Sequence, residues 1–341
     1  MRQTDFARHL TDFIGKYLPL ECGVSPLTIK TYSYTFTLLL TFFRERELLK
    51  PEQISLKEIT KDRVISFLNW LEKERKCSVS TRNNRLAALH SFFNYLQYRN
   101  VEGLAQWQEI LSIKHKKSAS PEMSYLTIEG VKLLLRQPDL KTRNGRRDFV
   151  LLGLMYDSGC RVQELINLTP ADIRHDENVT VRLCGKGRKV RIVPLSRNQV
   201  SNLLKFLDEK GLNRPEAQTK PIFQNPQGNK LTRMAMLNIV KKYVEMAKSI
   251  NPDIIPDGIG CHSLRHSKAM HMLEADINLV YIRDFLGHSS TTTTEVYARA
   301  SEKMKQEALS KLDKSIVKEG KTSWQKDKGL MAYLKELQNK Y

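Results

Sequence analysis

The chain has 341 residues, with 56 Lys and Arg against 37 Asp and Glu, and a formal net charge of +19. Its length suffices for two ordinary domains, and its charge favours a polyanionic partner, nucleic acid ahead of a membrane surface. The longest apolar run, residues 149–156, is far shorter than the ~20 residues that span a bilayer, and the N-terminus lacks an apolar signal segment. Five cysteines without close pairing argue against a disulfide scaffold and for a reducing cytosol.

Residues 1–112 are predicted to form an all-helical domain. Apolar periodicity and capping residues predict helices over 5–18, 25–49 and 60–73, and a fourth helix capped by Ser80 and Thr81. The opening turns of this fourth helix carry three polar residues, Arg82, Asn83 and Arg85. Basic side chains around a helix N-terminus suit DNA phosphates, and the alternative is a solvated charged face. The charge of the whole chain favours DNA.

Residues 113–124 break the helical pattern and are predicted to be a linker. The stretch is polar and basic, and it contains Pro121. It also carries Lys116 and Lys117, which we expect to contact DNA. A basic linker suits a two-domain clamp that closes around a duplex.

Residues 125–312 are predicted to form a second domain with a small antiparallel sheet. Alternating apolar residues on both sides of the turn at 185–189 predict a β-hairpin, and a third short strand is expected at 172–173. Helices are expected over 127–136, 146–158, 199–210 and 233–248, and over most of 261–299. The predicted fold class is therefore mainly α with a small antiparallel β-sheet.

Residues 313–341 are predicted to form a tail that ends in an amphipathic helix. Leu330, Leu334 and Leu337 make an apolar stripe beyond a Lys-rich hinge with Gly320. Such a helix packs either on its own domain or, in trans, on a neighbouring protomer, and the sequence does not decide between the two.

The stretch around Tyr297 has the residue types that chemistry on a phosphodiester requires. A phenol with a pKa of ~10 is a poor nucleophile at neutral pH, so it needs a histidine as a base and an arginine to neutralise the phosphate charge. The stretch offers both in the run His262-Ser-Leu-Arg265-His266. His262 and His266 are also spaced like a helical metal pair, but the arginine between them and the missing acidic ligand argue against a metal. We expect His266 to be a core residue outside the chemistry. His288, taken alone, is equally compatible with a helix C-cap.

Two earlier motifs add positive charge. Arg161 opens a helix after a glycine, where its guanidinium can bind a phosphate while Glu164 supports it; the alternative is a surface ion pair. Lys186 lies in a Gly-Lys-Gly turn, where a lysine among other cations can protonate a leaving alkoxide. The alternative for Lys186 is a merely solvated basic turn.

These residues occur in a single order within one domain, and the combination resembles the tyrosine recombinase (phage-integrase) family. The matching motifs are Gly159-Cys-Arg161-Val-Gln-Glu164-Leu165, Gly185-Lys186-Gly187, His262-Ser-Leu-Arg265-His266, Leu286-Gly-His288 and Tyr297. The resemblance spans about residues 10–312 and fills every position of the family's pattern. The chain looks shorter at its N-terminus than integrases with an arm-site domain, and longer at its C-terminus than the members that resolve chromosome dimers.

The resemblance implies a site-specific DNA recombinase that cleaves and rejoins strands through a 3′-phosphotyrosyl intermediate. By similarity the roles are Tyr297 as nucleophile, Arg161 and Arg265 on the non-bridging oxygens, His262 as proton relay, Lys186 as acid for the leaving 5′-oxygen and His288 as a hydrogen-bond donor. It also implies no metal or other cofactor, double-stranded DNA sites as partners, a dimer on each site, a tetramer on two sites, and no membrane partner. The expected location is the cytoplasm, at the nucleoid.

Two other functions stay open from the sequence. A type IB topoisomerase or a hairpin-forming resolvase uses similar chemistry without exchanging strands between two sites. A non-catalytic DNA-binding regulator would keep the domains without the cleavage. The length and the lack of an arm-site domain favour a simple recombinase acting on short inverted sites, as in a transposon or other mobile element.

Overall fold

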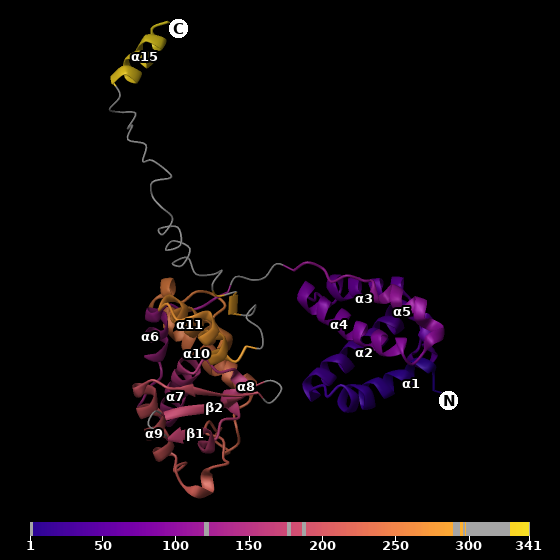
Figure 1. The fold of residues 1–341 in the computed structure, drawn as a ribbon, viewed down its shortest axis with the longest axis horizontal. Coiled ribbons are helices and arrows are strands. Elements are labelled where there is room, and N and C mark those ends of the chain that lie inside the picture. Colours follow the sequence, from indigo (N-terminus) through magenta and orange to yellow (C-terminus); the bar gives the residue numbers. More distant parts are fainter. Residues whose placement is uncertain are drawn as a thin grey trace. The chain divides into compact units, whose positions relative to one another are not determined.

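The computed structural model describes residues 3–118, 123–175, 179–185, 189–288, 294–295, 297 and 328–340. The chain separates into two compact units, Met1–Pro121 and Glu122–Tyr341 (Figure 1). Each unit has a hydrophobic core of its own. The described part is mainly helical with one small antiparallel sheet, which confirms the predicted fold class.

The first unit is built from helices. They are α1 (Asp5–Asp12), a π-helical continuation (Phe13–Glu21), α2 (Pro26–Arg46), α3 (Lys61–Lys73), α4 (Val79–Gln97) and α5 (Leu104–Leu111), with 3₁₀ turns at Pro51–Gln53, Leu56–Glu58 and Val101–Gly103. Of these, α1, α2, α3 and α4 begin at serine or threonine caps. The helix α4 begins earlier than predicted, because Ser78 and not Ser80 caps it. The hydroxyl of Ser78 accepts a hydrogen bond from the backbone amide of Thr81, at 3.2 Å.

Aromatic side chains hold these helices together. Phe92 of α4 is fully buried, and its ring meets those of Phe6, Phe13 and Phe36 edge to face at centroid distances of 5.9, 5.2 and 5.2 Å. Such pairs stabilise a core beyond the area that they bury. The three partners come from α1, the π-helical segment and α2, so α4 is the centre of the first unit.

The beginning of the stretch predicted to be a linker is attached to the first unit. Ile113 belongs to its core. The side chain of Asn83 on α4 exchanges two hydrogen bonds with the backbone of Lys116, of 2.8 and 3.1 Å. The ammonium of Lys116 also pairs with Glu72 of α3 at 2.6 Å.

The second unit contains the sheet and most of the motif residues. Its helices are α6 (Ile128–Leu135), α7 (Arg143–Asp157), α8 (Val162–Ile166), α9 (Arg197–Glu209), α10 (Arg233–Ile250), α11 (Cys261–Glu274), α12 (Leu279–Leu286) and α15 (Lys328–Gln338), with 3₁₀ turns at Pro170–Asp172, Pro215–Ala217 and Pro252–Ile254. The strands β1 (Ile173–His175), β2 (Val179–Cys184) and β3 (Val190–Pro194) form an antiparallel sheet in the order β1-β2-β3. Cys184 pairs with Val190, so the hairpin turns at residues 185–189, as predicted.

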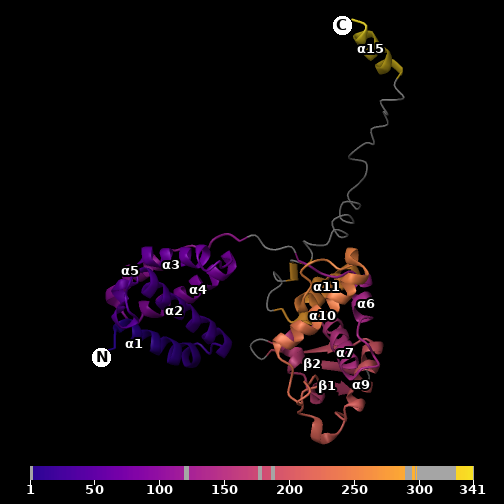
Figure 2. The same cartoon turned by 180° about the vertical axis from the view of Figure 1, so that it is seen from behind.

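The helix α7 runs through the core of the second unit. It packs against α6, α9 and α11, and its Leu151, Leu152 and Met155 are fully buried. In both views the sheet and α9 lie towards one end of this unit and α11 towards the other (Figures 1 and 2). The sheet also touches α8 through β2 and α12 through β3. These contacts bring the segments around Arg161, Arg191 and Gly287 together.

Candidate active site

Arg161 stands at the sharp turn that joins α7 to α8. Gly159 before it has a φ of +54°, a left-handed conformation that glycine adopts readily. Arg161 then begins α8: its backbone amide and its Nη1 donate to the two carboxylate oxygens of Glu164, at 2.8 and 2.9 Å. Its Nη2 donates to the carbonyl oxygen of Gly287 at 3.1 Å. The side chain keeps 32% of its surface exposed, so part of the guanidinium is open to a ligand.

Arg265 is buried beside it on α11. Its Nη1 donates to the carbonyl oxygen of Gly159 at 2.6 Å, and its Nη2 to that of Leu286 at 2.7 Å. Burial, followed by the charges of Arg161 and Arg191, lowers its pKa to about 10. The guanidinium thus stays charged at neutral pH in a region of surplus positive charge, which favours an anionic ligand.

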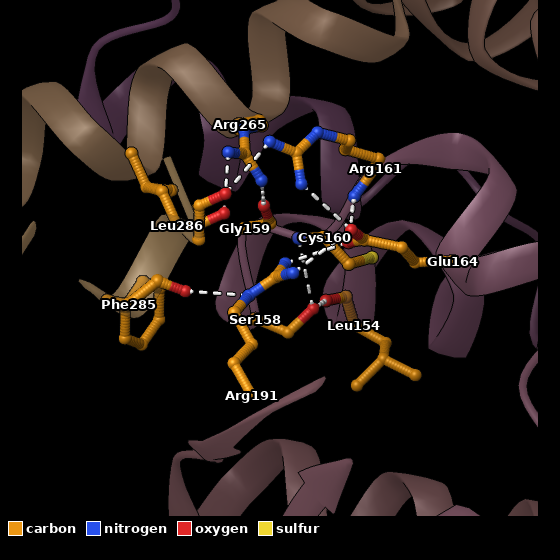
Figure 3. A network of polar contacts seen from close by, with 11 residues as sticks. Leu154, Ser158, Gly159, Cys160, Arg161, Glu164, Arg191, Arg265, Phe285 and Leu286 are labelled. Atoms are coloured by element: carbon orange, nitrogen blue, oxygen red, sulfur yellow. Dashed lines mark hydrogen bonds and ion pairs between the residues drawn. The ribbon is translucent and has the colours of Figure 1, made fainter. Parts of the chain in front are cut away.

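Glu164 is the carboxylate at the centre of this network (Figure 3). Besides Arg161 it binds Arg191 of β3, whose Nη1 and Nη2 donate to its two oxygens at 3.0 and 2.8 Å. Burial alone would raise the pKa of Glu164, but hydrogen bonds from Arg191 and Arg161 hold it at about 2. Arg191 is not among the residues predicted from the sequence. The signal that could have found it is an arginine inside the otherwise apolar run of β3.

Tyr297 is 3% exposed and packs on a small apolar cluster with α11 and α12 residues such as Met270 and Leu286. Its hydroxyl lies 3.0 Å from Nδ1 of His266. The ring of His288 stacks on it at 6.2 Å, and Nδ1 of His288 lies 2.9 Å from the Thr294 hydroxyl. Burial raises the pKa of Tyr297, while the charges of Arg265 and Arg161 act to lower it.

The position of His266 corrects our expectation that it is only a core residue. It is the histidine that touches the phenol, through the hydrogen bond given above, whereas His262 lies one turn earlier on α11 with its ring 6.4 Å from that of His266. His262 is exposed, and desolvation of the covered part of its ring, then the charge of Arg265, lowers its pKa. The spacing of His266 four residues after His262 was the available signal, because residues four apart share one face of a helix.

Lys186 lies outside the described residues, but the base of its hairpin turn is described. The amide of Gly185 donates to the carbonyl oxygen of Lys189 at 2.8 Å. A Cβ placed on Gly185 would lie 3.1 Å from a Glu164 carboxylate oxygen and 3.5 Å from Arg161 Nη1. Gly185, which follows β2, therefore lies directly beside the Glu164 carboxylate.

The residues of the first unit that we predicted to bind DNA differ in exposure. Arg82 is 5% exposed, and its Nη1 is directed at Asn83 and at the carbonyl oxygen of Lys114. Arg85 is half-buried and donates to the backbone and side chain of α2 at Thr31 and Thr35. Lys116 and Lys117 are exposed. Their roles in DNA binding stay predictions, and the burial of Arg82 favours an indirect one.

The described residues contain no cluster of His, Cys, Asp and Glu that could hold a metal ion. Nor is any helix among them long and apolar enough to cross a membrane. What they bring together is a tyrosine hydroxyl, three histidines and a pair of arginines that suits a phosphate. This arrangement suits nucleophilic attack on an anionic ester.

Comparisons with known proteins identify the family. The second unit matches the phage integrase family over residues 124–304, and the first matches the phage integrase N-terminal SAM-like domain over residues 12–100. The chain is 32% identical to a putative integrase/recombinase of Sinorhizobium fredii over 338 residues, 98% of this chain and 99% of that protein. It is 30% identical to the tyrosine recombinase XerD of Listeria innocua over 295 residues, 86% of this chain and 94% of XerD.

Solved structures share the fold. The XerH site-specific recombinase bound to palindromic difH substrate, in a post-cleavage complex, aligns with a TM-score of 0.68 at 22% identity, covering 88% of this chain and 84% of that one. The Tn1549 transposon integrase in complex with transposon right end DNA aligns with a TM-score of 0.68 at 16% identity, covering 89% and 99%.

The chain belongs to the phage integrase family of tyrosine recombinases. It is a DNA breaking and rejoining enzyme for site-specific recombination, and the phosphotyrosine mechanism is general for this family. The resemblance, the fold class and the class of reaction expected from the sequence are confirmed.

Proposed function

We propose that Tyr297 attacks the scissile phosphate of duplex DNA and forms a 3′-phosphotyrosyl link, with release of a 5′-hydroxyl. Arg161 and Arg265 bind the non-bridging oxygens and stabilise the charge that builds up there. The observation that carries this proposal is the shared environment of the three residues: the phenol contacts the same helix that holds Arg265, and both guanidiniums act on its pKa.

The remaining roles follow from the family pattern. His262 relays the phenolic proton, Lys186 protonates the leaving 5′-oxygen and His288 donates a hydrogen bond to the phosphate. The attack of tyrosine replaces one phosphodiester bond by another, which conserves the bond energy. The strand exchange therefore needs no nucleotide cofactor. The arginines supply the electrostatic stabilisation that a metal supplies in other phosphoryl-transfer sites, and cleavage is expected to proceed in the presence of a chelator.

The DNA partner is proposed to be held by both units as a clamp, with units at 1–112 and 125–312. The stretch 113–124 joins them, and its first residues up to Lys116 pack on the first unit. The exposed Lys116 and Lys117 bind phosphates directly, and Asn83 holds the backbone of Lys116. Buried Arg82 supports the same segment through the carbonyl of Lys114, and the half-buried Arg85 on α4 adds a further guanidinium. We expect double-stranded recombination sites, a dimer on each site and a tetramer on two sites. A solved relative supports the dimer: lambda integrase has been seen as a dimer bound to a core site. The enzyme then acts in the cytoplasm, at the nucleoid.

The tail helix α15 is proposed to join these protomers. Its Met331, Leu334 and Leu337 are 48%, 43% and 36% exposed, and an amphipathic helix gains by burying such a face in a groove. A neighbouring protomer is the occupant that we propose, because every copy in the assembly offers the same surface.

The test of the proposed function is covalent trapping on a nicked suicide substrate. Wild-type protein is expected to form an adduct that survives denaturation, and Tyr297→Phe to form none while still binding the DNA. An adduct that persists in Tyr297→Phe would refute the assignment. A two-site recombination assay, run beside relaxation of a one-site supercoiled plasmid, then distinguishes strand exchange from topoisomerase action.

A further inference from the structure

In the described part of the structure, the guanidinium of Arg191 makes hydrogen bonds with all three of its nitrogens to other groups of the protein. Its Nη1 and Nη2 form a fork on Glu164, and its Nε donates to the carbonyl oxygen of Phe285 at 2.9 Å (Figure 3). The side chains of Arg191 and Glu164 are 10% and 3% exposed. With all three nitrogens occupied and the side chain buried, Arg191 is not placed to receive a phosphate. Any effect on the reaction passes through its partners.

The first of these partners is Glu164, which Arg191 shares with Arg161. If Glu164 faced Arg161 alone, the two would form a neutral ion pair. The carboxylate would then offset the positive charge of Arg161 that is needed to bind a phosphate. Arg191 makes the bidentate contact that pairs best with a carboxylate. Arg191 thereby neutralises the negative charge of Glu164. The positive charge of Arg161 remains available to a phosphate at the exposed part of its guanidinium.

The second partner is the turn that ends α12. Arg191 binds the carbonyl of Phe285, and the carbonyls of Leu286 and Gly287 just after it hold Arg265 and Arg161. A Cβ on Gly287 would come 2.9 Å from Cδ of Arg191, so this side chain lies directly against the turn. His288 follows immediately. One side chain on β3 therefore contacts the segment that orients both phosphate-binding arginines.

We propose that Arg191 is a positioning residue of the recombinase reaction, which neutralises Glu164 so that Arg161 keeps its charge for the scissile phosphate and fixes the Phe285–His288 turn. The inference rests on the proposed function of Arg161 as a phosphate ligand. It adds a residue of the hairpin's second strand to the site, and it assigns that residue an electrostatic effect that can be measured.

The experiment measures the single-turnover rate of adduct formation on the nicked substrate, with enzyme saturating. Arg191→Met is expected to lower this rate about 10- to 100-fold, as loss of a supporting partner does at metal ligands, while DNA affinity changes little. The Arg191→Met/Glu164→Gln double variant is expected to recover most of that loss, since removing both members of a buried pair leaves no uncompensated charge. A double variant as slow as Arg191→Met, or slower, would overturn the neutralisation of Glu164 and leave Arg191 only its contact with the Phe285–His288 turn.

A matched control is available on the surface of the same unit. Arg146 also forms a bidentate ion pair, in which its Nε and Nη2 donate to Glu209 at 2.8 and 2.8 Å, and it binds backbone carbonyls. It lies near the start of α7, at the end opposite to Arg161. Arg146→Met is expected to leave the rate of adduct formation unchanged, and a loss equal to that of Arg191→Met would show that the effect is general destabilisation.

Arg191→Lys keeps the test valid should Arg191→Met fold poorly. It retains the charge beside Glu164 and is expected to react within about fivefold of wild type, a change of about 1 kcal/mol. A loss of 100-fold in this variant would contradict the electrostatic role. Failure of the proposed function looks different, because wild type itself would then give no adduct dependent on Tyr297. A full-rate adduct in Arg191→Met overturns only the role of Arg191.

Discussion

Nδ1 of His266 lies 3.0 Å from the hydroxyl of Tyr297, a contact that joins helix α11 to a residue 31 positions later in the chain. Burial, then the neighbouring His262 and Arg265, lowers the pKa of His266 to about 4. The imidazole is therefore neutral at pH 7 and can accept a hydrogen bond from the phenol. A base this weak is suited to orienting the hydroxyl and not to removing its proton.

The first prediction concerns this contact. His266→Phe should lower the single-turnover cleavage rate by up to about tenfold, because a hydrogen bond of this kind contributes ~0.5–1.5 kcal/mol. The same helix offers a matched control: Nδ1 of His271 lies 2.9 Å from the hydroxyl of Tyr156, away from the proposed nucleophile. His271→Phe is expected to leave cleavage unchanged. A loss above about 100-fold in His266→Phe would instead identify His266 as the general base.

The second prediction concerns the pH dependence of stability. Burial, then the charges of Arg265 and Arg161, lowers the pKa of His288 to about 4. This is the value that His266 also has. A folded pKa below the unfolded value of 6.5 means that the unfolded state binds more protons between about pH 6.5 and 4, so stability falls as the pH falls through this window. Melting temperatures measured at about pH 7 and about pH 5 should differ less in His288→Asn than in wild type. Equal shifts in both proteins would contradict the low pKa.

The third prediction uses two glycines with similar backbones. Gly287 and Gly211 have φ values of +66° and +62°, but only Gly287 has a close neighbour, Arg191, whereas Arg214 is 3.9 Å from a Cβ on Gly211. Alanine at either position strains the backbone by about 1 kcal/mol or more. Gly287→Ala should in addition displace Arg191 and slow cleavage more than its loss of melting temperature explains. If the two variants cleave at the same rate, the contact between Gly287 and Arg191 does not matter for the reaction.

The sequence predicted those parts of the site that are encoded locally or in the family pattern. Capping residues and apolar periodicity located the helices, and glycine before Arg161 indicated its sharp turn. The partners that the sequence missed are distant in the chain: Arg191 is 27 residues from Glu164, and Tyr297 is 31 residues from His266. Such pairs depend on how β3, α11 and α12 pack, which no short pattern encodes.

In the first unit, a residue that the sequence predicted to face DNA is covered by protein. Arg82 was interpreted from its place at a helix start, where basic residues often meet phosphates. The following chain covers this position, since the carbonyl of Lys114 and the side chain of Asn83 accept from Arg82. Tertiary packing therefore decides whether a charged residue at a helix N-terminus is available to a ligand.

The fourth prediction separates the two roles in this unit. Arg82→Gln should lower the melting temperature, because it removes a buried group that fixes the segment after α5. Lys117→Ala should leave stability unchanged and weaken DNA binding, with a slope of log affinity against log salt that is smaller by about 0.9 if one phosphate contact is lost. An unchanged salt slope in Lys117→Ala would show that Lys117 makes no phosphate contact. A stable Arg82→Gln with weakened binding would favour direct contact for Arg82.

The fifth prediction concerns the tail. Deleting residues 320–341 removes α15 with its exposed Met331, Leu334 and Leu337. If this face docks on a neighbouring protomer, the deletion should reduce two-site synapsis and strand exchange, since contacts between subunits are lost. Binding of one protein to a single site should change little, because the motif residues and the first unit remain.

A point variant isolates the apolar face from the length of the tail. Leu334→Glu places a charge in the proposed interface, where it cannot be buried without a partner, and should reproduce the synapsis defect. Glu336→Gln on the same helix changes charge outside the apolar stripe and should not. Gel-shift and multi-angle light-scattering measurements on paired sites would report both. Normal tetramers from Leu334→Glu would exclude docking in trans and leave α15 with a role, if any, on its own subunit.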